Sequence, residues 1–521
     1  MPDDSTTHNP TPNGDVPSPD SWLRGETFAQ GFILMIALTG GQRLIGFVRG
    51  VLFCRWLPAE ELGAWDLAFG FLLLAAPLAV LGIPGAFGRY VEHYRQRGQL
   101  RTFLRRTGII SLSLAVAGVV TVALARNWFG WFIFDDPSQG PLVLLTCVCL
   151  IGVIANNFLL ELFTALRQMR IVSLMGLSTS MLFAALGIGL LFGVQQTASM
   201  VIIAYGVACA ITALLAGYAL WKTWQEIPTD GDSLPQRTLW SKLAPFAAWV
   251  WMTNLLTNLF AIADRYMIVH FSDLSATEAA VVVGNYHSSR VVPLLIVSIA
   301  MMISGMLLPH LAHDWEAGRR SEVSQRLNLL FKSFGLSFLA AAIGIMLFAP
   351  LLFTVVLSGK YAAGLEVLPW TLTYCVWFSL SLMAEVYLWT AERPGLACLA
   401  YLFGLIANVV LNWLLVPLWG LHGAVVATTV GNAIALTLAL AISQRQGLKF
   451  DPAVWLVAVL PVTLIFGVIP SAIVWVIVVA LALKTNWFFD PDQKQTIADT
   501  VGGYVAKVKT IFTRSHHAMA G

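Results

Sequence analysis

The chain has 521 residues, of which 58% are hydrophobic and only 11% are charged, whereas soluble domains carry about 25% charged residues. This composition excludes a soluble globular protein and indicates an all-α polytopic membrane protein. The net charge of +3 gives no indication of a nucleic-acid partner.

The first 27 residues differ from the rest of the chain. They are rich in Pro, Asp, Ser and Thr, and they have no basic start, apolar stretch or cleavage site. We therefore predict a disordered cytoplasmic tail over 1–27 and not a signal peptide.

Apolar stretches long enough to cross a bilayer follow one another along the chain, since a spanning helix needs about 20 apolar residues. The predicted spans lie near 30–54, 64–86, 107–126, 141–163, 171–194, 198–221, 243–269, 282–308, 330–356, 367–390, 397–417, 420–443, 453–468 and 470–484. The last pair is short and is interrupted by Pro461 and Pro470. The predicted organisation is thus an N-terminal lobe (28–222), a cytoplasmic linker (223–242), a C-terminal lobe (243–445), two extra helices (446–484) and a cytoplasmic tail (485–521). The valines and isoleucine at 501–511 predict an amphipathic helix within that tail.

Lysine and arginine gather on one side of the membrane. The segment 89–106 holds six arginines, and 309–332 holds Arg319, Arg320, Arg326 and Lys332, while the opposite loops are nearly bare apart from Lys360. By the positive-inside rule, both termini face the cytoplasm. We interpret these basic residues as topology and headgroup anchors and not as a site.

The chain also repeats itself weakly at an offset of about six helices. Arg49 matches Arg265, and Gly63 matches Gly284. Further matches in the same order are Gly98 with Gly318, Arg167 with Arg393, and Gly193 with Gly420. Because the offset spans an even number of helices, both halves insert in the same orientation, which predicts two six-helix lobes with substrate between them.

Three stretches carry a resemblance to a known family: "RGVLFCRWLPAEELGAWDLA", "WMTNLLTNLFAIADRYMI" and "ANVVLNWLLVPLWGLHGAVVAT". In this order, the chain over about 28–445 resembles the multidrug/oligosaccharidyl-lipid/polysaccharide (MOP) exporter superfamily, in particular the Wzx-type polysaccharide flippases. The resemblance implies a MATE-like fold, here with two extra C-terminal helices and about fourteen spans in all.

The resemblance also implies a function and a location. A protein of this kind sits in the bacterial cytoplasmic (inner) membrane. It flips undecaprenyl-diphosphate-linked oligosaccharide for O-antigen, capsule or exopolysaccharide assembly. Its expected partners are the lipid-linked substrate, membrane lipids and the polysaccharide polymerase machinery. No cofactor is expected, and coupling to a proton or sodium gradient is left open.

Charged residues within the predicted spans are the candidate site, because such residues usually face a bundle interior or an aqueous cavity. Arginine binds phosphate bidentately and stays charged when it is desolvated. The predicted binding residues for the anionic diphosphate-sugar are Arg43, Arg49, Arg265 and Arg290. Arg43 and Arg49 have an alternative, which is to pair with Asp66 or with a helix end.

The carboxylates and asparagines of the spans have separate predicted roles. Ion coupling and a structural clasp both remain open for Asp66, Asp264, Glu161 and Glu385. For Asp264, the predicted ion-pair partners are Arg290 and Arg49. Asn408 and Asn412 are four residues apart on one helix face and are predicted to hold helices together.

Two other classes of protein compete with the flippase. A cation-coupled multidrug exporter has the same fold but would need an excess of carboxylates and aromatic residues. A membrane enzyme of envelope polysaccharide synthesis needs a catalytic set on large external loops, and the predicted external loops are short. The six cysteines and the membrane histidines show no metal-ligand spacing, so we expect neither catalysis nor a metal.

Overall fold

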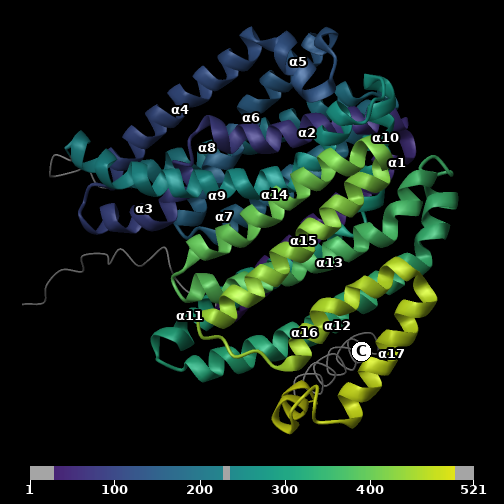
Figure 1. Cartoon of the computed structure of the whole chain (residues 1–521). Helices are drawn as coiled ribbons and strands as arrows, with labels where there is room; N and C mark the ends of the chain where they lie inside the picture. Colours follow the sequence, from purple (N-terminus) through teal and green to yellow (C-terminus); the bar gives the residue numbers. More distant parts are fainter. Residues whose placement is uncertain (1–27, 227–234, 499–521) are drawn as a thin grey trace, which may run out of the picture.

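The computed structural model describes residues 28–226 and 235–498, and these residues contain helices and no strand. Figure 1 shows long helices packed side by side, with α16 and α17 of the last part of the chain against α12. The predicted all-helical, multi-span fold is confirmed. The predicted tail 1–27 and the segment 501–511 lie outside the described residues.

The first group of helices runs to residue 226. Its members are α1 (Phe28–Trp56), α2 (Ala59–Ala79), α3 (Phe87–Gln96), α4 (Leu100–Leu124), α5 (Arg126–Phe134), α6 (Gly140–Ala165), α7 (Met169–Gly193) and α8 (Ala198–Glu226).

The second group begins at residue 236. Its members are α9 (Gln236–Phe271), α10 (Ala276–Arg290), α11 (Leu294–Glu316), α12 (Arg320–Leu351), α13 (Ala362–Thr390), α14 (Pro394–Trp419), α15 (Leu421–Arg445), α16 (Pro452–Val459) and α17 (Val468–Lys484). A π-helical turn, Leu352–Val356, extends α12, and a 3-10 turn, Leu460–Phe466, extends α16.

Eleven helices of the described residues are long and apolar enough to cross a membrane. The first predicted span coincides with α1, which carries Arg43, Arg49 and Arg55. The last predicted pair coincides with two shorter apolar helices, Pro452–Phe466 and Val468–Lys484. Pro461 stands in the 3-10 part of the first of them, where a missing backbone N–H is tolerated better than inside an α-helix.

The helices of the structure add detail to the sequence-based interpretation in three places. The span 282–308 is not one helix, because α10 ends at Arg290 and α11 begins after Pro293, whose ring disfavours a continuous α-helix through the residue before it. The described residues of the predicted linker 223–242 are helical apart from Pro235, since α8 extends to Glu226 and α9 begins at Gln236. The basic segment 89–106 forms most of α3 and the start of α4.

Contacts divide the helices into two groups that meet at a narrow seam. Helices α1 and α3 to α8 pack mainly within the first group, and α9 and α11 to α17 mainly within the second, whereas α2 and α10 pack most extensively against each other across the seam. The main connections between the groups run from α2 to α9 and α10. One part of this seam lies toward the end of the bundle that carries few basic residues, named here the arginine-poor end and formed by segments 57–58, 134–140, 194–197, 272–275 and 357–361. At the opposite end, residues 82–90 pack against the start of α9, where the Tyr90 hydroxyl donates to the Lys242 carbonyl.

Two glycines permit the contact between α2 and α10. A Cβ atom added to Gly63 would overlap the carbonyl oxygen of Ala280, and one added to Gly284 would overlap that of Ala59. The two contacts are related by the repeat, because Gly284 is the equivalent of Gly63 and Ala280 is the equivalent of Ala59, each 221 positions further along the chain. The repeated glycines of the sequence therefore face each other across a symmetric close approach.

This packing predicts that Gly63→Ala destabilises the protein by about 1–3 kcal/mol, because the added methyl group must push two backbones apart. The measurement is thermal or denaturant unfolding of the purified protein in detergent. Gly217→Ala in α8 is the matched control, since a Cβ there meets nothing within 4 Å. Equal stability of the two variants would contradict the close approach.

Candidate functional site

A buried carboxylate joins the two helix groups. Asp66 of α2 is only 2% exposed, and Arg265 of α9 is 3% exposed. Arg265 Nε lies 3.1 Å from Asp66 Oδ2, and Arg290 Nη1 lies 3.7 Å from the same oxygen. His287 Nδ1 lies 2.8 Å from Asp66 Oδ1. These four residues are named here the Asp66 cluster.

The close approach of α2 and α10 brings the cluster together. Asp66 is three residues after Gly63, and His287 is three residues after Gly284, so each lies almost one turn beyond the glycine contact. By the helix rise, Asp66 is about 10 Å along α2 from its start at Ala59. The cluster therefore lies within the span and not at the surface. Because it is buried, its ion pairs are only weakly screened by water and salt.

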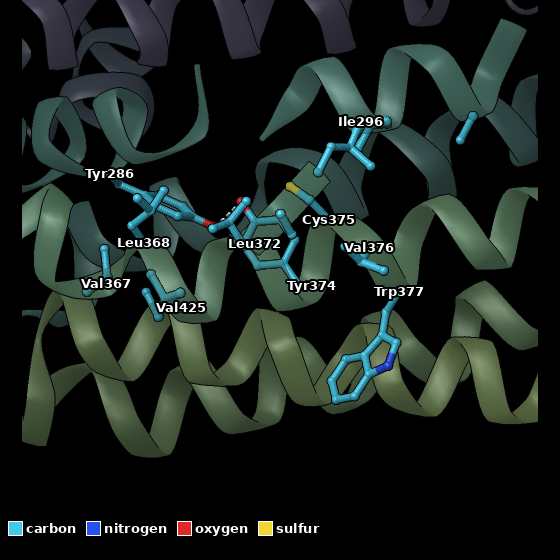
Figure 2. Close-up of a cluster of buried hydrophobic side chains, with 14 of the residues drawn as sticks. Tyr286, Ile296, Val367, Leu368, Leu372, Tyr374, Cys375, Val376, Trp377 and Val425 are labelled. Carbon is cyan, nitrogen blue, oxygen red and sulfur yellow. Dashed lines mark hydrogen bonds between the residues drawn. The ribbon is translucent and has the colours of Figure 1, made fainter. Parts of the chain in front are cut away.

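Asp264 has a different role from its neighbour Arg265. Its Oδ2 accepts hydrogen bonds from the Tyr286 hydroxyl and from Thr428 Oγ1, and its Oδ1 accepts from the backbone N–H of Arg265. The Tyr286 hydroxyl is also hydrogen-bonded to the Tyr374 hydroxyl at 3.2 Å, and Figure 2 shows these two side chains meeting in the core of the second group. Asp264 thus forms an ion pair with neither Arg290 nor Arg49, and the partner of Arg290 is Asp66.

The two predicted asparagines extend this network. Asn408 and Asn412 are fully buried. Asn408 of α14 donates to Thr428 of α15 at 3.1 Å, and Asn412 donates to the Asn408 side-chain oxygen at 3.2 Å. The chain from Asn412 through Asn408 and Thr428 to Asp264 links α14, α15 and α9.

Further contacts join the groups near the arginine-poor end. His270 of α9 lies 3.4 Å from Asp135, which follows α5, and its other ring nitrogen lies 2.9 Å from the Phe132 carbonyl oxygen. The Tyr266 hydroxyl donates to the Leu67 carbonyl at 2.9 Å. In addition, Arg55 at the end of α1 donates to the Val356 carbonyl. This end of the seam is closed.

The remaining predicted residues lie elsewhere. Arg43 is exposed on α1 and Arg49 is partly buried, and neither has an ion pair within the part of the chain that the structure describes. Glu161 is exposed on α6. Glu385 is partly buried in α13 beside Tyr401 of α14. The structure therefore brings together Arg265, Arg290 and Asp66 but not Arg43 or Arg49.

Sequence reasoning missed His287, Tyr286 and Thr428. His287 is one of the membrane histidines, for which the sequence predicts no metal site. The signal that points to it is the equal spacing of Gly63 to Asp66 and Gly284 to His287 in the two repeats. Tyr286 and Thr428 have no such signal, because tyrosine and threonine in apolar helices are common packing residues.

Comparison with known proteins identifies the family of this chain. The family model described as "Polysaccharide biosynthesis protein" matches residues 28–315, which is more than half of the chain. The chain belongs to this family. The described part of this family member contains no group of three or more His, Cys, Asp or Glu residues that could hold a metal ion.

Two curated proteins are similar to this chain in sequence at low identity. The uncharacterized membrane protein MJ1068 of Methanocaldococcus jannaschii is 20% identical over 415 residues, covering 75% of this chain and 78% of that protein. Stage V sporulation protein B of Bacillus subtilis is 29% identical over 97 residues, or 19% of this chain and 18% of that protein. Only a short part of the sporulation protein is therefore matched.

Solved structures show the same fold. The lipid II flippase MurJ in an inward closed conformation has a TM-score of 0.63 at 13% identity, covering 92% of this chain and 100% of that one. An inward-facing multidrug resistance MATE transporter of the MOP superfamily has a TM-score of 0.62 at 16% identity, covering 80% of this chain and 97% of that one. The predicted MOP-type, MATE-like fold is confirmed.

The Asp66 cluster predicts a coupled stability effect. Asp66→Asn leaves two arginines without their carboxylate, and such a loss costs about 3–5 kcal/mol. The double variant Asp66→Asn/Arg265→Gln should be destabilised by clearly less than the sum of the single changes. The measurement is denaturant unfolding of the four proteins of this double-mutant cycle. Additive destabilisation would show that the two side chains do not interact.

Proposed function

We propose that this family member flips undecaprenyl-diphosphate-linked oligosaccharide across the bacterial inner membrane for surface polysaccharide assembly. The family match supports polysaccharide biosynthesis, and the fold is one that known transporters use. Two features of the chain suit this substrate. The arginines within the spans can bind its diphosphate, and a membrane-spanning protein can contact its lipid.

One observation carries the proposal: two arginines of α1 have no carboxylate partner in the described chain. Arg265 and Arg290 share the carboxylate of Asp66, whereas Arg43 and Arg49 have no ion pair in the described chain. A charged side chain within a span costs several kcal/mol. An anion that binds there offsets that cost, and a cationic drug would increase it.

Alternating access would act on the closed end of the seam. For the arginine-poor end to open, α2 must separate from α10, and Asp66 must leave Arg265, His287 and Arg290. Those two arginines would then be free for the diphosphate, joining Arg43 and Arg49 in the predicted anion site. In this proposal Asp66 is the clasp and Asp264 holds the second group together.

Export in cells tests the proposed function. Loss of the protein should leave lipid-linked oligosaccharide in the cytoplasmic leaflet and remove surface polysaccharide, and Arg49→Ala should reproduce the loss at normal protein levels. Arg49→Lys should restore only part, because an ammonium lacks the bidentate fork. The measurements are surface polysaccharide by antibody labelling and leaflet distribution of the glycolipid. Unchanged polysaccharide together with raised drug sensitivity would instead support the multidrug exporter.

Locking the arginine-poor end should stop export. Asp135 and His270 are in contact across the seam, so cysteines at these two positions can be joined by a short, reducible bifunctional reagent in a background without the six native cysteines. Export should fall to the background level after cross-linking and return after reduction. The control is either single cysteine variant with the same reagent. Full export by the cross-linked protein would exclude opening at this end.

A further inference from the structure

Arg49 lies on an aromatic ring instead of beside a carboxylate. The centre of its guanidinium group, Cζ, is 4.0 Å from the centroid of the Phe183 ring. Phe183 belongs to α7 and is only 3% exposed, so its ring is held by its surroundings. The guanidinium group therefore has a fixed support in the first helix group.

Other aromatic rings of the first group surround Phe183. Trp65 and Phe69 of α2 and Tyr205 of α8 form, with Phe183, the group named here the aromatic platform. The centroid of Phe183 lies 5.6 Å from that of Trp65 and 5.1 Å from that of Tyr205, and Phe69 lies 5.5 Å from Tyr205. Such edge-on and tilted pairs stabilise a cluster beyond the burial of its area. The support under Arg49 is thus rigid and comes entirely from the first group.

A ring acts on arginine differently from a carboxylate. The face of the ring attracts the cation and fixes its position, but it does not take up the fork of N–H donors that matches a phosphate. Arg290 provides the contrast, because it lies over the Tyr286 ring at 5.2 Å and also shares Asp66. In the closed seam Arg290 and Arg265 are occupied, whereas Arg49 is positioned and unpaired in the described chain.

We propose that Phe183 is a positioning residue that holds Arg49 ready for an anion, so that Arg49 binds the diphosphate before Asp66 releases Arg265 and Arg290. The identity of that anion rests on the proposed function. The proposal adds an order of events: the first group binds the anion while the seam is still closed, and the second group contributes its arginines when the seam opens.

Replacing the ring without changing its apolar character tests the proposal. Phe183→Leu and Phe183→Met remove the ring face but keep a large apolar side chain. Both should weaken binding about 2- to 10-fold, the range expected for one cation–π contact, while Phe183→Tyr keeps the ring and should bind within about 2-fold of the unaltered protein. The probe is inorganic pyrophosphate, titrated into the purified full chain in detergent.

The matched control is Phe53→Leu. Phe53 is as buried as Phe183 and lies edge-on to it at 5.6 Å, so it tests general loosening of the same packing. Phe53→Leu should leave binding unchanged, and Phe183→Leu should have no further effect in an Arg49→Ala background. In export assays Phe183→Leu should raise the substrate concentration for half-maximal rate and leave the maximal rate nearly unchanged.

The outcomes separate this inference from the proposed function. Equal loss of binding in Phe53→Leu and Phe183→Leu, or unaltered binding in Phe183→Leu and Phe183→Met, would overturn the positioning role. If the pyrophosphate results are as expected but the chain does not flip lipid-linked oligosaccharide, the proposed function is wrong and the positioning role remains. If Phe183→Leu does not fold, the comparison of Phe183→Met with Phe183→Tyr decides.

Discussion

A single carboxylate in contact with two arginines and a histidine of the other helix group is the interaction on which this structure depends. Asp66 is almost inaccessible to solvent, and an unpaired ion in such a place would cost several kcal/mol even after relaxation of its surroundings. Arg265, His287 and Arg290 offset that cost, and all three belong to the second group. Separation of the two groups would leave Asp66 without these partners, so in the proposed transport cycle the seam is the element that changes.

The packing around the cluster explains which side of the seam is free to change. Gly63 and Gly284 let two backbones touch, so a small rotation of α2 away from α10 removes the contact of Asp66 with its cations. On the other side, Asp264 is bound by Tyr286 and Thr428 within the second group. Arg265 is thus attached to a network that does not cross the seam. A rigid second group and a separable Asp66 are what a rocking motion requires.

The sequence predicts the helices well and the site only in part. Apolar length locates the spans because hydrocarbon requires it, but the break at Pro293 and the helical basic segment 89–106 depend on packing that hydropathy does not report. Charges within spans correctly mark Asp66, Arg265 and Arg290 as unusual. Their pairing is not predictable, since it depends on a close approach of two helices 221 residues apart. The contact between Arg49 and the Phe183 ring is likewise not predictable from the sequence, because phenylalanine is common in apolar helices.

Competition between Asp66 and a bound diphosphate for the same two arginines would link substrate binding to opening of the seam. A ligand shifts a conformational equilibrium only by the difference in its affinity for the two states. A diphosphate that bound Arg43 and Arg49 alone would bind both states alike, because these residues belong to one rigid group, and it would not open the seam. A diphosphate that also takes Arg265 and Arg290 competes with Asp66, and that gain exists only when α2 has moved away. In the proposed mechanism, the shared carboxylate would therefore make opening depend on an anion with enough charge to replace it.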